Sequence, residues 1–497
     1  MRRRLKWGAA TACGAIALAL VPGPASAGNS YDLVIAGGRV IDPASGRDEI
    51  ADIGINGGSI AAISASRLEG KRRIDVKGLV VAPGFIDLHA HGQDPVAERF
   101  QLLDGVTTAI DMEIGTAPVA ALYRRMEGKA LINFGASASH ICARLEVMSD
   151  KRCGPDVEGR LTADPAMLVK GATPEQEAQI TAILDREVAS GALGYGIGLE
   201  YVPGAGRREI FRVFEAAAKT KAPVFVHVRS RPPDQGSGVP IAVAQEVLAD
   251  AAATGASLQI VHVASTGLRD TPAILELIKG ARAHGVDVTT EAYPYTAGST
   301  AIGSNFFADG WQERNGATYG DVQWPATGER LTKESFDRFR KEQPDAAVVI
   351  HIIPQEVVDR AITDPIVSIA SDGMPWITAG EHPRGAGTFS RVLGQYVRER
   401  QLLDLPAALA KMTIMPARRL EAVSPQMARK GRLQAGADAD ITVFDPATIR
   451  DRATFDQPMQ ASTGIAYVLV GGQVMARAGK VTAHRFPGQA IRSDLPH

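Results

Sequence analysis

Short apolar runs alternate with longer amphipathic segments through the middle of the chain. Eight runs have the length and composition of buried strands: Phe85–Leu88, Thr108–Ile110, Ala130–Phe134, Leu193–Gly196, Pro223–Val228, Leu258–Val263, Val286–Ala292 and Val367–Ser371. Helical patterns lie between several of them: Pro174–Ser190, Arg208–Lys219, Val239–Thr254 and Thr271–His284. Eight strands that alternate with helices predict an α/β fold, a (β/α)8 barrel of the TIM type. An open doubly wound sheet shows the same alternation, but none of the early turns supplies its usual glycine-rich phosphate loop.

The two ends of the chain carry a different pattern, with short alternating strands that turn at Gly-Gly or Asn-Gly pairs. Such turns are typical of β-hairpins. We expect one small β-sandwich domain built from both ends, residues 28–83 and 426–497, around a barrel at 84–425. Residues 296–364 are too long for a simple loop and contain a predicted helix at Lys333–Lys341, so we expect an insertion that shapes the active site.

The first 27 residues have the layout of a secretory signal peptide. Basic residues precede an apolar run at Trp7–Val21, and Ala25-Ser26-Ala27 forms an A-x-A cleavage site. We expect removal of residues 1–27 and an exported protein, periplasmic or secreted; the alternative is an uncleaved interfacial anchor. No later stretch is long enough to cross a membrane, so no stable span is expected after cleavage.

The composition and net charge of the chain argue against some classes of protein. The 497 residues are 45% hydrophobic and 22% charged, which is typical of a globular protein rather than a disordered one. The formal net charge of −1 lacks the basic excess of a nucleic-acid-binding surface, and no nucleic-acid partner is expected. Beyond the leader two cysteines remain, Cys142 and Cys153, and spacing leaves open whether they form a disulfide or stay free thiols.

Histidines stand where several predicted strands end. In a barrel of this type the chemistry lies at the C-terminal ends of the strands. Two imidazoles at positions i and i+2 of an extended chain face the same side and can reach one metal ion. The candidate ligands at the ends of the first, fifth, sixth and eighth strands are His89, His91, His227, His262 and Asp372. Together they predict a metal site with one ion or two.

A site with two ions needs an anionic ligand between them. Asp111 and Glu113 share a face at the end of the second strand. Glu113 is nearer the strand end, so we expect it to be the bridge. The alternatives are a bridge by Asp111 and a structural role for both acids.

Several motifs carry a resemblance to a known family. The segment Pro83–His91 resembles the opening signature of the amidohydrolase superfamily. Later segments resemble its D-aminoacylase (N-acyl-D-amino-acid deacylase) branch: Gly198–Gly204, Tyr293–Ala297, His382–Arg384, Gly387–Phe389, Lys411–Thr413, Pro416–Leu420 and Gly436–Asp440. The resemblance covers nearly all of the chain after the leader. It implies a zinc-dependent barrel with a small β-sandwich from both termini.

The chain departs from this branch at two positions. Members carry a metal-binding cysteine at the end of the second strand, where this chain has Asp111–Gly115. Glu113 would take that role and offers a harder oxygen ligand. The branch also often has a lysine two residues after the sixth-strand histidine, where this chain has Ala264.

The expected reaction is zinc-assisted hydrolysis of a C–N amide bond in a small N-acyl amino acid or dipeptide. Asp372 would accept the proton of the attacking water and deliver it to the leaving amine. Arg384 would bind the substrate carboxylate with two hydrogen bonds. Further hydrogen bonds or pocket contacts are expected from Tyr201, Tyr293, Tyr295 and His140.

Three other functions remain open from the sequence. A dipeptidase that acts on dipeptides with a D-residue differs from a deacylase only in the acyl group. A cyclic-amide hydrolase of the dihydroorotase or hydantoinase kind shares the fold but usually carries a carboxylated lysine near the fourth strand, where this chain has Leu193–Gly196. A non-catalytic exported metal- or ligand-binding protein would not need the proton carrier Asp372.

Overall fold

The computed structural model describes residues 30–153, 161–162, 164–229, 239–376, 382–482 and 485–495. The expected signal peptide at residues 1–27 lies outside these ranges. None of the helices in the described ranges is both long enough and apolar enough to cross a bilayer.

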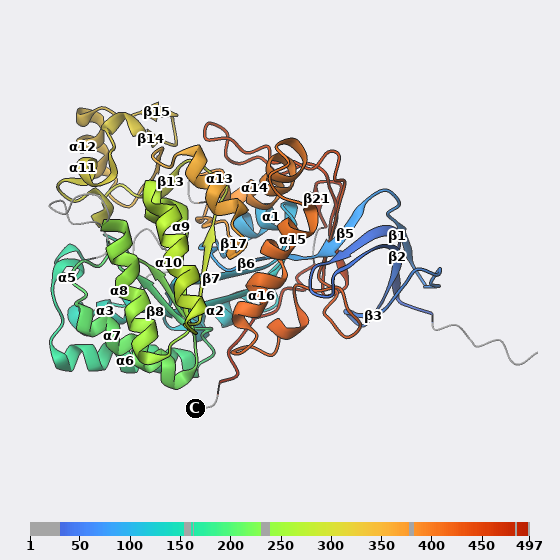
Figure 1. Cartoon of the computed structure of the whole chain (residues 1–497), viewed down its shortest axis with the longest axis horizontal. Coiled ribbons are helices and arrows are strands. Elements are labelled where there is room, and N and C mark those ends of the chain that lie inside the picture. Colours follow the sequence, from blue (N-terminus) through green and yellow to red (C-terminus); the bar gives the residue numbers. More distant parts are fainter. Residues whose placement is uncertain are drawn as a thin grey trace, which may run out of the picture.

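An eight-stranded parallel barrel forms the centre of the molecule (Figure 1). Its strands in chain order are β6 (Phe85–Asp87), β7 (Val106–Thr116), β8 (Asn133–Ser139), β9 (Tyr195–Gly198), β10 (Val224–His227), β11 (Leu258–Ile260), β12 (Val288–Ala292) and β17 (Val367–Ile369). The ring closes just beyond β6 and β17, where Ala90 and Gly373 form a parallel bridge and the Asp372 amide donates to the His89 carbonyl at 2.8 Å. The predicted barrel is confirmed.

Helices follow most of the strands and cover the outside of the barrel. Capping residues explain several of their starts. Asp94 accepts hydrogen bonds from two amides of the first helix, and Thr173 and Gln176 form a capping box at the start of α6. The helices are α1 (Pro95–Leu103), α2 (Val119–Met126), α3 (His140–Ser149), α5 (Pro165–Val169), α6 (Pro174–Ala189), α7 (Arg207–Thr220), α8 (Val239–Thr254), α9 (Val263–Gly267), α10 (Thr271–Ala283), α13 (Gln355–Thr363), α14 (Arg384–Arg391), α15 (Leu405–Met412) and α16 (Ile414–Leu420). The same part of the described chain also contains short 3-10 turns at Leu268–Asp270 and Met427–Arg429 and a π-helical stretch at Val392–Glu399.

Two barrel strands differ most from their predicted positions. The third strand lies at Asn133–Ser139 instead of Ala130–Phe134, because its C-terminal half is made of small residues that give little strand signal. The second strand runs on to Thr116, well past the predicted end at Ile110, with an irregular register against β8 after Asp111. This extension carries the acidic residues of the site.

Both ends of the chain contribute to one β-rich unit, as predicted, and its sheet has nine strands. Its strands are β1 (Leu33–Asp42), β2 (Arg47–Asn56), β3 (Ser59–Ser64), β4 (Arg73–Asp75), β5 (Val80–Pro83), β18 (Ile441–Phe444), β19 (Ile465–Val470), β20 (Gln473–Arg477) and β21 (Lys480–Val481). The N-terminal and C-terminal strands meet where β5 pairs antiparallel with β18. Apolar residues from both ends form a hydrophobic cluster separate from the barrel core. Figure 1 shows β1, β2 and β3 beside the barrel, on the side away from α6 and α7.

The insertion between β12 and β17 folds as a unit of its own. It contains a four-stranded sheet and several short helices: β13 (Gly298–Ala301), β14 (Val322–Trp324), β15 (Glu329–Arg330), β16 (Ala347–Ile350), α11 (Trp311–Asn315), α12 (Lys333–Glu342) and 3-10 turns at Asn305–Phe307 and Tyr319–Asp321. Aromatic rings form its core, with Trp311 stacked on Phe336 at 5.7 Å between centroids. In Figure 1 this unit extends beyond α8 and α10 at one end of the barrel.

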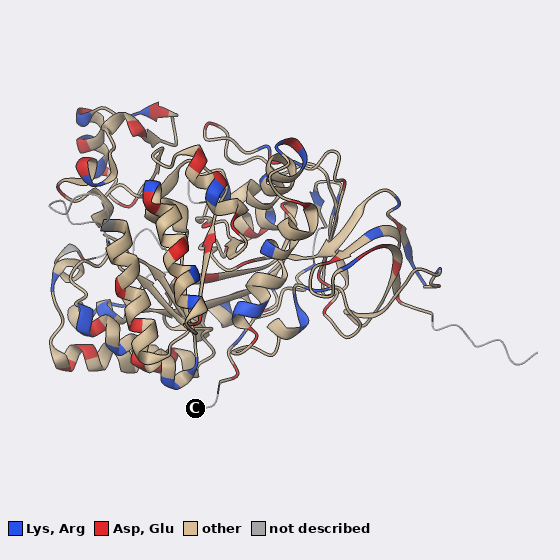
Figure 2. Ribbon diagram, viewed as in Figure 1, with Lys and Arg blue, Asp and Glu red and all other residues tan. Residues whose placement is uncertain are grey.

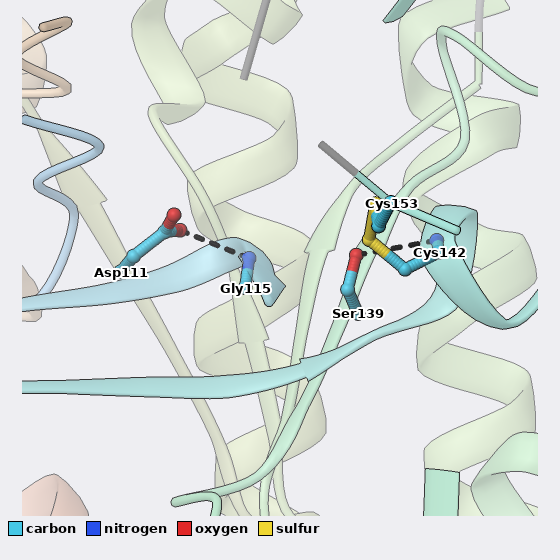
Figure 3. Close-up of a disulfide and its surroundings, with 5 residues drawn as sticks. All are labelled: Asp111, Gly115, Ser139, Cys142 and Cys153. Carbon is cyan, nitrogen blue, oxygen red and sulfur yellow. Dashed lines mark hydrogen bonds between the residues drawn. A yellow bond between two sulfur atoms is a disulfide. The ribbon is translucent and has the colours of Figure 1, made fainter. Parts of the chain in front are cut away.

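The two remaining cysteines form a disulfide. Cys142 in α3 is bonded to Cys153, which lies shortly after the helix (Figure 3). Ser139 caps the start of α3, and its hydroxyl accepts a hydrogen bond from the Cys142 amide. The bond therefore ties the segment after α3 back to the first turn of that helix.

Charged side chains of both signs are spread over the outer helices, as Figure 2 shows for α6, α7 and α12. Few of them lie on the barrel strands, so the acidic residues that do are exceptions. Those exceptions gather at the ends of the strands.

Candidate metal centre and active site

His89 and His91 follow β6 and point at one spot. Their Nε2 atoms are 3.1 Å apart, and both side chains are buried. Asp87 fixes the backbone here, because one of its oxygens accepts hydrogen bonds from the amides of His89 and Ser371, each at 3.1 Å. The pair is thereby held beside the end of β17, where Asp372 lies.

Glu113 on β7 lies between two groups of histidines. Its Oε2 atom is 3.0 Å from Nε2 of His89 and 3.1 Å from Nε2 of His91. Its Oε1 atom is 2.6 Å from Nδ1 of His227 and 3.4 Å from Nε2 of His262. One carboxylate thus faces both groups, which is the arrangement that a bridging ligand requires.

Asp372 completes the first group. Its Oδ1 atom lies 3.4 Å from Nε2 of His89 and 3.6 Å from Nε2 of His91, while Oδ2 accepts a hydrogen bond from Arg384 at 2.8 Å. The backbone of Asp372 has a φ of 53°, a left-handed conformation that is uncommon outside glycine and recurs at functional sites.

The six predicted ligands form two overlapping sets of possible ligand atoms. We call His89, His91, Glu113 and Asp372 the first subsite, and Glu113, His227 and His262 the second subsite. Nitrogen and carboxylate ligands in these numbers suit zinc. The structure therefore brings together every residue that the sequence analysis proposed as a metal ligand.

A further carboxylate, Glu291 on β12, was not predicted. Its Oε1 atom lies 2.5 Å from Nδ1 of His89, and its other oxygen accepts a hydrogen bond from Gln259. Asp111 has the matching position behind His91, with 3.1 Å between Oδ1 and Nδ1. Asp111 thus supports a ligand instead of forming the bridge. The only sequence signal for Glu291 is an acidic residue inside an otherwise buried strand.

Opposite charges in this site shift each other's pKa values. Burial acts to raise the pKa of Glu113, but His89 and His227 outweigh it and hold the pKa well below its usual value. Burial likewise acts to raise the pKa of Asp372, and Arg384 and His89 lower it below the usual range. Burial acts to lower the pKa of His89, yet the carboxylates of Asp372, Glu113 and Glu291 raise it well above its usual value.

A cavity opens above the metal ligands. Three residues predicted to bind substrate line it: Arg384, Tyr201 and Tyr293. Arg384 is fully buried, and its guanidinium lies 4.8 Å from the centre of the Tyr293 ring. Its Nη1 bonds to Asp372, and its Nε has no hydrogen-bond partner among the described residues.

Two predicted pocket residues lie outside the lining of this cavity. Tyr295 packs its ring against His382 at 5.2 Å and under Arg391 at 4.7 Å, behind the site. The structure therefore does not place Tyr295 beside Tyr293 in the cavity wall, because the chain leaves β12 at Ala292 and residues two apart no longer share a face.

His140 is the second correction. It is the first residue of α3 and is fully buried, with its Nε2 atom 2.7 Å from Glu209 of α7. Arg144, one turn further along α3, bonds to the same carboxylate. His140 is therefore part of the packing between two outer helices, away from the lining of the cavity.

The insertion supplies part of the cavity wall, as expected for residues 296–364. Lining residues that the sequence analysis did not name include Thr300, Phe306, Arg314, Asn315 and Ile350 from the insertion and Arg229 from the end of β10. None of these positions carries a motif, so only the fold could identify them.

Comparison with known proteins agrees with this geometry. A profile of the amidohydrolase family matches residues 72–476. The chain belongs to the amidohydrolase family. It is 34% identical to an N-acyl-D-glutamate deacylase of Alcaligenes xylosoxydans xylosoxydans, over 93% of this chain and 97% of that protein. It is 31% identical to a D-aminoacylase of the same organism, over 89% of this chain and 94% of the other.

Solved structures of the amidohydrolase family include a close match. The N-acyl-D-glutamate deacylase of Bordetella bronchiseptica, in complex with zinc and a phosphonate inhibitor that mimics the tetrahedral reaction intermediate, superposes with a TM-score of 0.79. The two chains are 29% identical, and the match covers 93% of this chain and all of the other. The resemblance seen in the sequence motifs is confirmed. This amidohydrolase hydrolyses amide bonds, and its cluster of His, Glu and Asp side chains could hold a metal ion.

Proposed function

We propose that this amidohydrolase is a deacylase of N-acyl-D-amino acids. The observation that carries the proposal is the position of Asp372, which lies between the metal ligands and Arg384 at the base of the cavity. A proton carrier and a carboxylate-binding group are thus adjacent to one hydrolytic centre. The relatives that hydrolyse N-acyl-D-glutamate and other N-acyl-D-amino acids support the D-configuration of the substrate.

Asp372 moves the proton in this reaction. A bound zinc ion supplies Lewis acidity, which activates water and polarises the amide carbonyl. The lowered pKa of Asp372 keeps the carboxylate ionised at neutral pH, ready to accept a proton from the attacking water. The same carboxyl group then gives that proton to the leaving amine, which departs as a neutral group.

Arg384 orients the substrate. Its Nη1 contacts Asp372, and its Nη2 lies 3.5 Å from the carbonyl oxygen of Ser299. In the proposed complex the guanidinium turns so that Nε and Nη2 hold the α-carboxylate of an N-acyl amino acid. This places the carboxylate close to the proton carrier, so the scissile amide is directed at the metal centre. Tyr201 and Tyr293 line the same cavity and can donate further hydrogen bonds.

The proposal is tested by measuring the hydrolysis of a panel of N-acyl-D- and N-acyl-L-amino acids by the zinc-loaded protein. We expect release of the free amino acid from the D-series, loss of activity after treatment with a chelator, and recovery with zinc. Preferential hydrolysis of dipeptides with a D-residue would show instead that the enzyme is a dipeptidase. No hydrolysis in either series, with zinc bound, would refute the proposal.

A cyclic-amide hydrolase is disfavoured by the fourth strand of the barrel. Bridging by a carboxylated lysine needs a long side chain there, but a Cβ atom on Gly196 of β9 would lie 2.5 Å from the carbonyl oxygen of Glu113. The carboxylate of Glu113 itself occupies the bridging position. Dihydroorotate in the same panel tests this alternative, and its hydrolysis would overturn our assignment.

We also propose that the enzyme acts outside the cytoplasm, as the signal-peptide pattern of residues 1–27 indicates. N-terminal sequencing of the mature protein should begin at Gly28. A mature protein that keeps residues 1–27 would contradict export by cleavage.

A further inference from the structure

The insertion meets the active site through an edge strand. β13 is the outermost strand of the four-stranded sheet and pairs there with β16. At the end of β13 the amide of Ile302 donates to the carbonyl of Ala346 beside β16, so the carbonyls of odd-numbered residues point the other way. An open edge leaves such carbonyls in need of partners. Those of Ala297 and Ser299 find them in side chains of the segment after β17.

His382 is the closer of the two partners. Its Nε2 atom lies 2.9 Å from the carbonyl oxygen of Ala297, and its Nδ1 atom accepts a hydrogen bond from the amide of Arg384 at 3.0 Å. Because an amide nitrogen only donates, Nδ1 is the acceptor, and in the neutral ring Nε2 carries the proton that Ala297 receives. Burial and the charge of Arg384 hold the pKa of His382 well below its usual value. One neutral imidazole therefore joins the arginine to the insertion.

The direct contact between Arg384 and the insertion is weaker. Its Nη2 atom lies 3.5 Å from the carbonyl oxygen of Ser299, which is at the long limit for a hydrogen bond. In the proposed complex this nitrogen turns to the substrate carboxylate, so the contact is lost when substrate binds. The two hydrogen bonds of His382 involve main-chain groups that substrate does not use. His382 is therefore the attachment that remains in the complex.

Aromatic rings also fix the orientation of His382. The residue is buried, and the rings of Tyr295 and Phe455 stand nearly perpendicular to its own, at 5.2 Å and 5.1 Å between centroids. Phe455 belongs to the segment between β18 and β19, and its ring also lies 4.7 Å from that of His351 in the insertion. The C-terminal part of the chain thus packs behind the substrate site and against the insertion.

We propose that His382 is a positioning residue for substrate recognition, which holds the backbone of Arg384 and the start of the insertion in one fixed arrangement, with Phe455 packed against it. Thr300 of β13 lines the cavity, so His382 also sets where this wall stands relative to the substrate carboxylate. The inference rests on the proposed function in one respect, the binding of that carboxylate by Arg384.

Two substitutions of His382 test this role in the zinc-loaded enzyme. His382→Leu removes both hydrogen bonds and keeps an apolar side chain. It should raise KM about 10- to 100-fold for N-acyl-D-amino acids through misplacement of Arg384, with little change in kcat or in zinc content. His382→Asn keeps an acceptor for the amide two residues further on and should recover part of the loss. An unchanged KM in His382→Leu, or an equal loss on carboxylate-free amides, would overturn the inference.

A double-mutant cycle shows whether His382 acts through Arg384. Combined with Arg384→Lys, His382→Leu should add much less to KM than it does alone, whereas fully additive losses would contradict a shared role. His351→Leu is the matched control, because the His351 ring also packs on Phe455 but lies outside the lining of the cavity. Its KM should stay close to that of the parent. A rise as large as in His382→Leu would indicate a general loss of packing and refute the role.

Hydrogen–deuterium exchange measures the attachment without any substrate. Peptides that cover β13 and the start of α14 should exchange faster in His382→Leu than in the parent, while those of the barrel strands should not. Phe455→Leu should give a smaller increase in the same peptides. Unchanged exchange in both variants would overturn this inference even in an active deacylase. The expected exchange in a protein that hydrolyses no N-acyl-D-amino acid would support the attachment and refute the proposed function alone.

Discussion

Replacing Asp372 by asparagine separates proton transfer from metal binding. Asparagine has nearly the same shape, and its amide oxygen can still accept the hydrogen bond that Arg384 donates at 2.8 Å. The fold should therefore remain intact. The variant cannot accept the proton of the attacking water, and loss of a general acid–base group lowers rates about 10²- to 10⁴-fold. That range corresponds to about 3–5 kcal/mol of transition-state stabilisation.

The assay compares kcat of the zinc-saturated Asp372→Asn variant with that of the parent on an N-acyl-D-amino acid. Asp111→Asn is the matched control, because Asp111 supports His91 from 3.1 Å without facing the cavity. We expect the control to bind zinc about 10- to 100-fold more weakly, with excess zinc restoring its turnover. Excess zinc should not restore the turnover of the Asp372→Asn variant. Turnover near the parent value in the zinc-loaded variant would refute the assigned role of Asp372.

Three further predictions follow from described contacts. Arg384→Lys should raise KM about 10- to 100-fold for substrates with a carboxylate, because one ammonium cannot replace a bidentate contact, and an equal loss on carboxylate-free amides would contradict this role. Surrounding carboxylates raise the pKa values of His89 and His91 in the metal-free site, although burial acts to lower them. Zinc binding at neutral pH should therefore release protons from both rings, and zinc affinity should increase with pH. Calorimetry in buffers of different ionisation enthalpy measures this release, and its absence would show that both rings are neutral. Reduction of the disulfide between Cys142 and Cys153, which are 11 residues apart, should lower the free energy of unfolding by about 3 kcal/mol, measured as the shift of the urea midpoint with and without reductant.

The barrel was predictable because buried apolar runs alternate with helical patterns along the middle of the chain. The metal ligands were predictable for a related reason, since a barrel gathers the ends of its strands on one face. His227 and His262 are far apart in the sequence from His89, yet one carboxylate touches all three. Position at a strand end was sufficient to find them.

The errors arise where a residue's neighbours come from other parts of the chain. Tyr295 was assigned to the pocket on the assumption that the alternation of β12 continues, but that strand ends before it. His140 was assigned to the pocket because it directly follows a strand end. Glu291 was missed because its role depends on His89, about 200 positions earlier in the chain, and periodicity carries no information about such a pairing. The sequence also left undecided whether Cys142 and Cys153 form a disulfide, because their spacing along the chain does not determine the distance between their sulfur atoms.

The aromatic core of the insertion has a consequence for how this enzyme can evolve. Trp311, Phe336 and their neighbours stabilise the insertion from within, while its residues Phe306 and Arg314 face the cavity. Mutations in that wall need not disturb the barrel strands that carry the metal ligands. Substrate preference can therefore change through this wall while the barrel strands, which carry the hydrolytic chemistry, are inherited unchanged.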